Sequence, residues 1–298
     1  MENGLRKMHP AIPILVLVIG VACLSSGSIL VRLADAPAIT KSAYRLAISA
    51  LIVIPYALRY HRRDYLTMSR RDLSLCAGSG FFLALHFATW IASLDYTTIA
   101  SSVILVNTIP VWIAIFGVVT GLARLGRKMW ISVALGFLGA CIVGYGDVTF
   151  GGTALWGNFL ATAGAWFAAA YIMCGKEVRK KLDLAPYIAL SYGFAAVILW
   201  AVVLIGGYQI TGFTNATWLA LVGLAIVPQI IGHTSYNWAL GYFSAGFIGI
   251  LLLGEPLGSV ILAYLLFDEA PTLIKIAGGA LLMYAIVAAA REESAGNS

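Results

Sequence analysis

The chain of 298 residues is 61% hydrophobic and only 11% charged, with a mean hydropathy of +0.91. A soluble domain of this length needs a largely polar exterior, so the composition excludes that class and favours an integral membrane protein. A backbone in hydrocarbon must satisfy its own hydrogen bonds, which favours helices. The net charge of +6 could indicate a nucleic-acid partner. The positions of the basic residues argue against that partner.

Ten apolar segments follow one another along the chain, each near the ~20 residues that span a bilayer. The polar connections between them are short and leave no room for a soluble domain. The segments are 11–33, 38–58, 73–93, 98–121, 129–146, 154–174, 185–206, 216–237, 243–266 and 272–290. We therefore predict an all-α membrane protein with ten transmembrane helices.

The basic residues predict an orientation. If the N-terminus is cytoplasmic, fifteen of the nineteen Lys and Arg residues lie on the cytoplasmic side, as expected for membrane proteins. The four that remain, at or near the opposite side, are Arg32, Lys41, Arg45 and Lys275. An even number of spans then places both termini in the cytoplasm. The charge is a topology signal, the lipid bilayer is the expected partner, and no nucleic acid is expected.

The chain also matches itself at an offset of 146 residues. Six positions between 94 and 115 are identical to their counterparts in the second half, and Pro110 falls on Pro256. A duplicated unit of five helices must re-enter the membrane upside down, because five is odd. We predict two inverted five-helix repeats, residues 1–150 and 151–298, with a binding site between them, as in many secondary transporters. The paired prolines predict kinks, either static or moving during transport.

Several short motifs lie at characteristic places over nearly the whole chain. They are Ala43-Tyr44-Arg45-Leu46, Ser93 to Ala100, Pro110, Trp166 with Tyr171, Glu255-Pro256, Phe267-Asp268-Glu269 and Pro271-Thr272. With these motifs the chain resembles the drug/metabolite transporter superfamily, in its ten-helix EamA branch. It differs in having Ser26-Gly27 where the family has Trp-Gly in helix 1, and in having Arg124 to Lys128 where an acidic residue follows helix 4.

Within that branch the chain is most similar to the bacterial YddG-type exporters of aromatic amino acids. This resemblance implies export of aromatic and other neutral amino acids across the bacterial inner membrane. It also implies a cavity lined by helices 1, 3, 4, 6, 8 and 9. Composition and spacing do not by themselves indicate that substrate.

Polar groups within a membrane are costly and are therefore functional candidates. The third span carries one polar and aromatic face, made by Ser79, Phe82, His86 and Trp90, and the eighth span carries Gln229, His233, Tyr236 and Asn237. We predict that the two faces are opposing walls of one substrate cavity. Alternatively, the histidines bond to neighbouring helices and never meet substrate, or they relay protons.

Three further residues are candidates for the site, and two of them have more than one possible role. Glu255, the one carboxylate deep in a span, could bind a substrate ammonium group or a proton, but a structural role beside Pro256 or a pairing with Arg45 is favoured. Asn107 could serve the kink before Pro110 or the cavity. Trp166 lies deep in its span and is expected near the substrate.

Competing functions can be weighed from motifs. The chain lacks HExxH, GxSxG and GxxxxGK[ST] sequences, so neither an enzyme nor an ATP-driven pump is expected, and no cofactor or metal is predicted. The four cysteines are scattered over the spans, where they are expected to fill apolar space. A channel, or a carrier of sugars or nucleotide sugars, stays open as an alternative. The sequence does not predict the oligomeric state.

Overall fold

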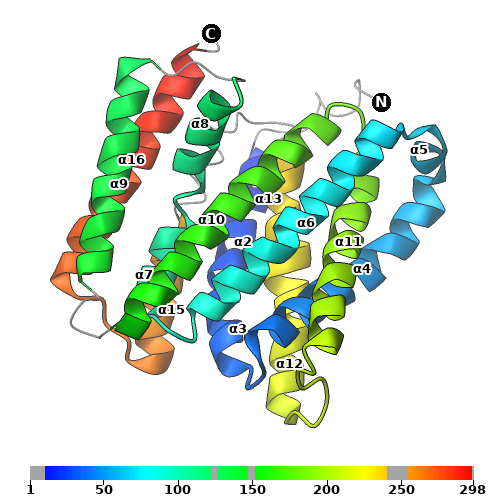
Figure 1. The fold of residues 1–298 in the computed structure, drawn as a ribbon, viewed down its shortest axis with the longest axis horizontal. Coiled ribbons are helices and arrows are strands. Elements are labelled where there is room, and N and C mark those ends of the chain that lie inside the picture. The colour runs from blue at the N-terminus through cyan, green and yellow to red at the C-terminus, as the bar shows by residue number, and fades with distance from the viewer. Residues whose placement is uncertain (1–10, 122–125, 147–151, 240–253, 297–298) are drawn as a thin grey trace.

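The computed structural model describes residues 11–121, 126–146, 152–239 and 254–296, and these are helical with short connections (Figure 1). The first half contains α2 (Ala11–Ser25), α3 (Gly27–Leu33), α4 (Ala38–Tyr60), α5 (Arg62–Thr67), α6 (Arg70–Ser93), α7 (Ile99–Val106), α8 (Ile109–Val119) and α9 (Arg127–Tyr145). The second contains α10 (Gly152–Val178), α11 (Leu184–Ile205), α12 (Asn215–Leu224), η2 (Ala225–His233), α13 (Thr234–Ala239), α15 (Gly254–Phe267) and α16 (Leu273–Gly296).

Seven helical segments of the described residues are long and apolar enough to cross a membrane. Three shorter apolar helices, Trp130–Val143, Gly254–Phe267 and Leu273–Ala288, lie at the remaining three predicted segments. The predicted all-helical membrane architecture is therefore confirmed. That the chain crosses the membrane ten times remains a prediction. The start of the predicted ninth span, residues 243–253, lies outside the described residues.

The helix pairs that pack together follow the internal repeat: each pair is matched by the pair of corresponding helices from the opposite halves. The third predicted span packs against the sixth (α6 with α10), and the first packs against the eighth (α2 with η2). The second packs against the seventh (α4 with α11), and the fifth against the tenth (α9 with α16). This pattern is expected of two halves related by a pseudo-twofold axis. It places both halves around a common centre.

Three predicted helices are irregular, and the first of them, 11–33, is interrupted at Ser26 between α2 and α3. The segment 98–121 is broken into α7 and α8 at Asn107 and Thr108, directly before Pro110, so the kink predicted there is present. The segment 216–237 contains nine residues of π-helix around Pro228. A proline cannot donate the backbone hydrogen bond of a regular α-helix, and π-helical turns occur often at functional sites. Pro228 gave a signal in the sequence that the prediction of a regular helix overlooked.

Helices α9 and α16 approach each other closely through glycine. A Cβ atom on Gly139 would lie 2.8 Å from the carbonyl oxygen of Gly278, and a Cβ atom on Gly278 would lie 2.9 Å from the carbonyl oxygen of Gly139. Only glycine allows backbones to approach so closely. Figure 1 shows this pair standing beside α8, apart from the layers formed by α6, α10, α11 and α4.

Candidate functional site

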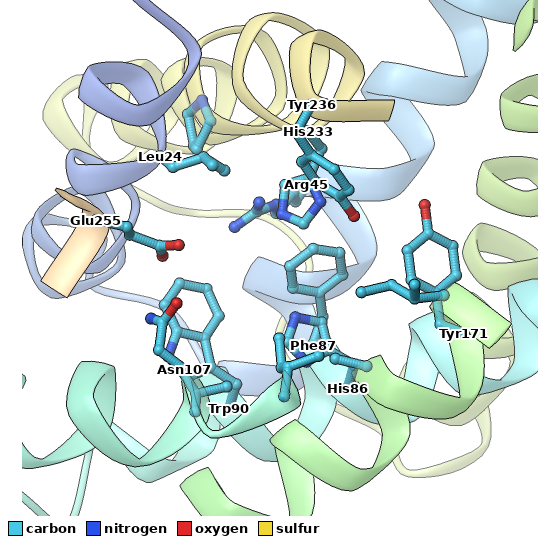
Figure 2. A pocket seen from close by; sticks show the side chains of 15 residues that line it. Leu24, Arg45, His86, Phe87, Trp90, Asn107, Tyr171, His233, Tyr236 and Glu255 are labelled. Carbon is cyan, nitrogen blue, oxygen red and sulfur yellow. The ribbon is translucent and has the colours of Figure 1, made fainter. Parts of the chain in front are cut away.

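A cavity lies where the two halves meet, and Figure 2 shows the side chains around it. It contains about 640 Å³ of space free of atoms, part of it open to solvent. The part of it that the centre of a water-sized sphere can enter is about 70 Å³. The lining comes from both halves and includes Leu24, Arg45, His86, Phe87, Trp90, Asn107, Tyr171, Pro228, His233, Tyr236 and Glu255.

Arg45 is the charged group at the centre of this wall. It lies in α4, seven residues from the helix start, which is about 10 Å along the axis, and its side chain is almost completely buried. Its Nε donates a hydrogen bond of 2.8 Å to Oε1 of Gln229 in η2. Its guanidinium carbon lies 4.0 Å from the centroid of the Phe87 ring, a cation–π contact. The sequence placed Arg45 at or near the outer side as a gating or structural residue, and the structure adds that it lines the cavity.

Glu255 lies on a different part of the same wall, at the second position of α15. Figure 2 shows its carboxylate turned into the cavity, with the amide of Asn107 facing it. The Asn107 amide also donates a hydrogen bond of 2.9 Å to the carbonyl oxygen of Val103, one turn back in α7. Asn107 therefore serves both the helix break and the cavity. Among the described residues, no ion pair within 4.0 Å joins Glu255 to Arg45.

The histidine and tryptophan of α6 lie on the cavity wall as the sequence predicts. His86 Nδ1 donates a hydrogen bond of 2.9 Å to the carbonyl oxygen of Gly164 in α10, which fixes the ring. The His86 and Trp90 rings are nearly parallel, 3° apart, with centroids separated by 6.1 Å. Trp90 is only 4% exposed, and its Nε1 has no hydrogen-bond partner among the described residues. His86 is thus both bonded to a neighbouring helix and exposed to the cavity.

The second half supplies the opposite aromatic groups. His233 packs edge-on against Phe87, with centroids 5.5 Å apart, and lies 5.4 Å from the Tyr236 ring. Tyr171 of α10 lines the cavity beside them. Two histidines and two tyrosines therefore surround the same space, and the predicted meeting of the third and eighth spans across one cavity agrees with this placement.

Four predicted substrate-binding residues lie outside the cavity lining. Ser79 bonds to Tyr187 and Ser191 of α11, at 2.9 and 3.2 Å. Phe82 packs against the main core and its neighbour Phe81. Trp166 packs edge-on against Trp112 of α8 and Phe159. Gln229 is fully buried behind Arg45, where it accepts the Nε hydrogen bond. Pro110 and Pro256, near the starts of α8 and α15, lie beside the lining residues Ile109 and Glu255.

Replacing Ser79 with alanine is expected to lower stability by about 0.5–1.5 kcal/mol, because the buried hydroxyls of Tyr187 and Ser191 each lose one hydrogen bond. The KM for transport is expected to stay unchanged, since Ser79 does not line the cavity. Thermal unfolding in detergent and transport in liposomes would measure the two effects. Ser74→Ala, which removes an exposed hydroxyl bonded only within α6, is the matched control. A raised KM with wild-type stability would return Ser79 to the substrate path.

A network of polar contacts holds the corner between α6 and α7, residues 94–99. Arg32 of α3 donates hydrogen bonds to the carbonyl oxygens of Leu94 and Thr97, at 3.1 and 3.0 Å. It also lies 3.6 Å from Glu269 in the α15–α16 connection, and Glu269 accepts from the backbone N–H of Ile99. We call these contacts the corner network. Through Arg32, the corner network connects α3 to the α6–α7 corner in the first half and to the α15–α16 connection in the second half.

Sequence reasoning missed part of the site. Phe87 lies three positions before Trp90, a spacing that places the two side chains on neighbouring positions of one helix face and could have identified it. Tyr171 was noted only as a motif residue, although a tyrosine within a span is itself a polar signal. For Arg45 the signal was present, a buried charge among Ser42, Leu46 and Ser49, but depth along a helix does not reveal its facing direction.

Comparisons with known proteins agree with this architecture. The chain is 26% identical over 278 residues to an uncharacterized transporter of Archaeoglobus fulgidus, covering 93% of this chain and 95% of that protein. It is 24% identical over 211 residues to the biotin transporter of Escherichia coli K12, covering 70% of this chain and 68% of that one. One crystal structure superposes with a TM-score of 0.63 over 94% of this chain and 98% of the other, at 17% identity, which shows the fold alone.

The EamA-like transporter family matches the sequence twice, over residues 11–145 and 155–291. These two matches cover most of the chain and agree with the internal repeat seen in the sequence. These matches support membership of the family and its transport function. They do not support membership of the YddG-type exporters within the family. The chain therefore belongs to the EamA-like transporter family and is a multi-pass membrane transporter.

Proposed function

We propose that the protein is a secondary transporter that exports aromatic and other neutral amino acids across the bacterial inner membrane. The observation that carries this proposal is the cavity with Arg45 and Glu255 on separate parts of its wall and aromatic rings around them. A free amino acid presents a carboxylate, an ammonium group and a side chain. The arginine, the glutamate and the rings are complementary to those three groups.

Alternating access is the proposed mechanism, with residues 1–150 and 151–298 acting as two inverted repeats. The exchanged packing of the halves supports it, as does the break at Asn107 and Thr108, where a bend can change without breaking regular helical bonds. Pro110 and Pro256 are the proposed bending points. Among predicted site residues, His86, Trp90, Asn107, His233 and Tyr236 are proposed to contact substrate.

The proposed orientation has both termini in the cytoplasm. Figure 1 shows α5 and the C-terminal end of α10 on the same side of the bundle as the end of α16. Helix α5 carries Arg62 and Arg63, the last turn of α10 carries Lys176, and Arg179 follows directly after that helix. A surplus of basic residues marks the cytoplasmic side. The corner network then lies on the outer side.

A second function is a carrier of carboxylates that have no ammonium group. The match to the biotin transporter favours it, since biotin has a carboxylate that could bind Arg45 and a ring system suited to the aromatic wall. In this case Glu255 would have a structural role beside Pro256 or would bind a proton. A sugar or nucleotide-sugar carrier is supported by no comparable contact in the cavity.

Transport into proteoliposomes separates these functions. Labelled phenylalanine, leucine, biotin and glucose are offered with and without a pH gradient, alongside empty vesicles. Saturable uptake of phenylalanine and leucine, with no electrical conductance, would support the proposal and exclude a channel. Uptake of biotin alone would support the second function, and uptake of glucose alone would contradict both.

A further inference from the structure

From the unpaired donors on the cavity wall we infer a carboxylate-binding subsite, formed by Nη1 of Arg45 and Nε1 of Trp90, with Gln229 positioning the arginine from behind. It rests on the proposed function only in taking the cavity as the substrate site. Whether the ligand also carries an ammonium group does not affect it.

The first step concerns what Arg45 lacks. Its side chain is 1% exposed, and Nη1 has no hydrogen-bond partner among the described residues. A buried charge without a partner is costly, and removing its partner costs more than the pair contributes. Because the unpaired nitrogen belongs to a residue lining the cavity, a ligand anion can supply the partner that the protein does not.

The second step concerns how the guanidinium is held. Gln229 accepts from Nε at 2.8 Å, and the Phe87 ring lies against the plane, 4.0 Å from Cζ. These contacts occupy one edge and one face of the guanidinium. Nη1 is left buried without a partner among the described residues, on a side chain that Figure 2 shows at the wall of the cavity. A neutral amide acceptor leaves the full positive charge available, whereas a carboxylate at the same place would neutralise it. Gln229 is therefore a positioning residue that also preserves the charge.

The third step concerns a second donor. Nε1 of Trp90 is buried without a partner in the described part of the chain, and the Trp90 ring centroid is 5.7 Å from the Arg45 guanidinium carbon. Indole N–H groups only donate hydrogen bonds. Two neighbouring donors, one charged and one neutral, match the two oxygens of a carboxylate. Glu255, on the other part of the wall, is left to face the remainder of the ligand.

The test compares three probes with the same ring: phenylalanine, 3-phenylpropionate, which has only the carboxylate, and phenethylamine, which has only the ammonium group. Gln229→Glu keeps an oxygen acceptor for Nε and gives Arg45 a permanent counter-ion. It is expected to weaken binding of both carboxylate probes by about 10- to 100-fold, in line with the loss of a charged hydrogen bond. Binding of phenethylamine is expected to be unchanged or tighter.

Two more variants act on the donors themselves. Arg45→Lys keeps the charge but loses the planar fork, and is expected to weaken both carboxylate probes about tenfold. Trp90→Phe keeps a ring but removes Nε1, and is expected to weaken them about fivefold. The matched control is Asn158→Asp, the same amide-to-carboxylate change at a buried residue outside the cavity lining, where the side-chain oxygen accepts from Thr97.

Dissociation constants would be measured by calorimetry on folded, monodisperse protein in nanodiscs. Wild-type affinity of Gln229→Glu for both carboxylate probes would overturn the subsite, and so would equal weakening of all three probes. If the wild type binds neither phenylalanine nor 3-phenylpropionate, the subsite is also overturned. If 3-phenylpropionate binds and responds as expected but phenylalanine does not bind, the subsite stands and the amino-acid function fails.

Discussion

A Glu255→Gln variant is expected to bind phenylalanine about 10- to 100-fold more weakly than the wild type and to lose most of its phenylalanine transport. The change keeps the shape of the side chain and its place opposite Asn107, but removes the only negative charge on the cavity wall of the described residues. A charge-assisted hydrogen bond to the substrate ammonium is worth about 1.5–3 kcal/mol. Binding of 3-phenylpropionate is expected to stay equal or to strengthen, since the variant no longer repels its carboxylate.

The measurement is the ratio of the two dissociation constants, together with uptake into liposomes. Glu177→Gln, which removes an exposed carboxylate paired with Lys180 at the end of α10, is the control for a change in net charge. If Glu255→Gln is folded and binds both probes as the wild type does, Glu255 has the structural role beside Pro256. The amino-acid proposal would then lose its ammonium site.

Arg32→Ala is expected to release the corner network and to shift the protein toward the state open on that side. The variant frees the carbonyl oxygens of Leu94 and Thr97 and removes the positive charge near Glu269. After allowance for the partial exposure of Arg32, we expect a loss of about 2 kcal/mol, which shifts a two-state equilibrium roughly 30-fold. Backbone amides in residues 94–106 are expected to exchange with solvent faster.

Hydrogen exchange read by mass spectrometry would follow that segment in the wild type and the variant. The control is Lys180→Ala, which breaks a fully surface ion pair and is expected to change little, because such pairs contribute about 0–1 kcal/mol. Unchanged exchange over 94–106 in a folded Arg32→Ala protein would show that the corner is held by packing alone. Substrate that slows exchange in the wild type would connect the corner to the cavity.

The sequence predicted the helices better than their internal geometry. Hydropathy located the spans because each must bury its backbone bonds in about the same thickness of hydrocarbon. It could not show the π-helical turn around Pro228, since hydropathy does not depend on the hydrogen-bond register. The break before Pro110 could be predicted from the sequence, because proline lacks the backbone N–H that a regular helix needs.

Some predicted site residues lie outside the cavity, because one face of a long helix contacts different neighbours at different depths in the membrane. Ser79 and Trp90 both belong to the predicted stripe of α6, but Ser79 contacts α11 whereas Trp90 reaches the cavity. Helical spacing predicts which residues share a face and not what covers that face. For the same reason the sequence did not show that Gln229 lies behind Arg45.

The glycine contact between α9 and α16 has a consequence for how the chain can be divided. The last helix of each half is covered by the last helix of the other, and the two meet backbone to backbone at Gly139 and Gly278. In a fragment ending after residue 150, the glycine surface of α9 that α16 covers would face lipid instead, which does not pack against it as closely. We therefore expect the two fragments to associate with each other more readily than either folds alone.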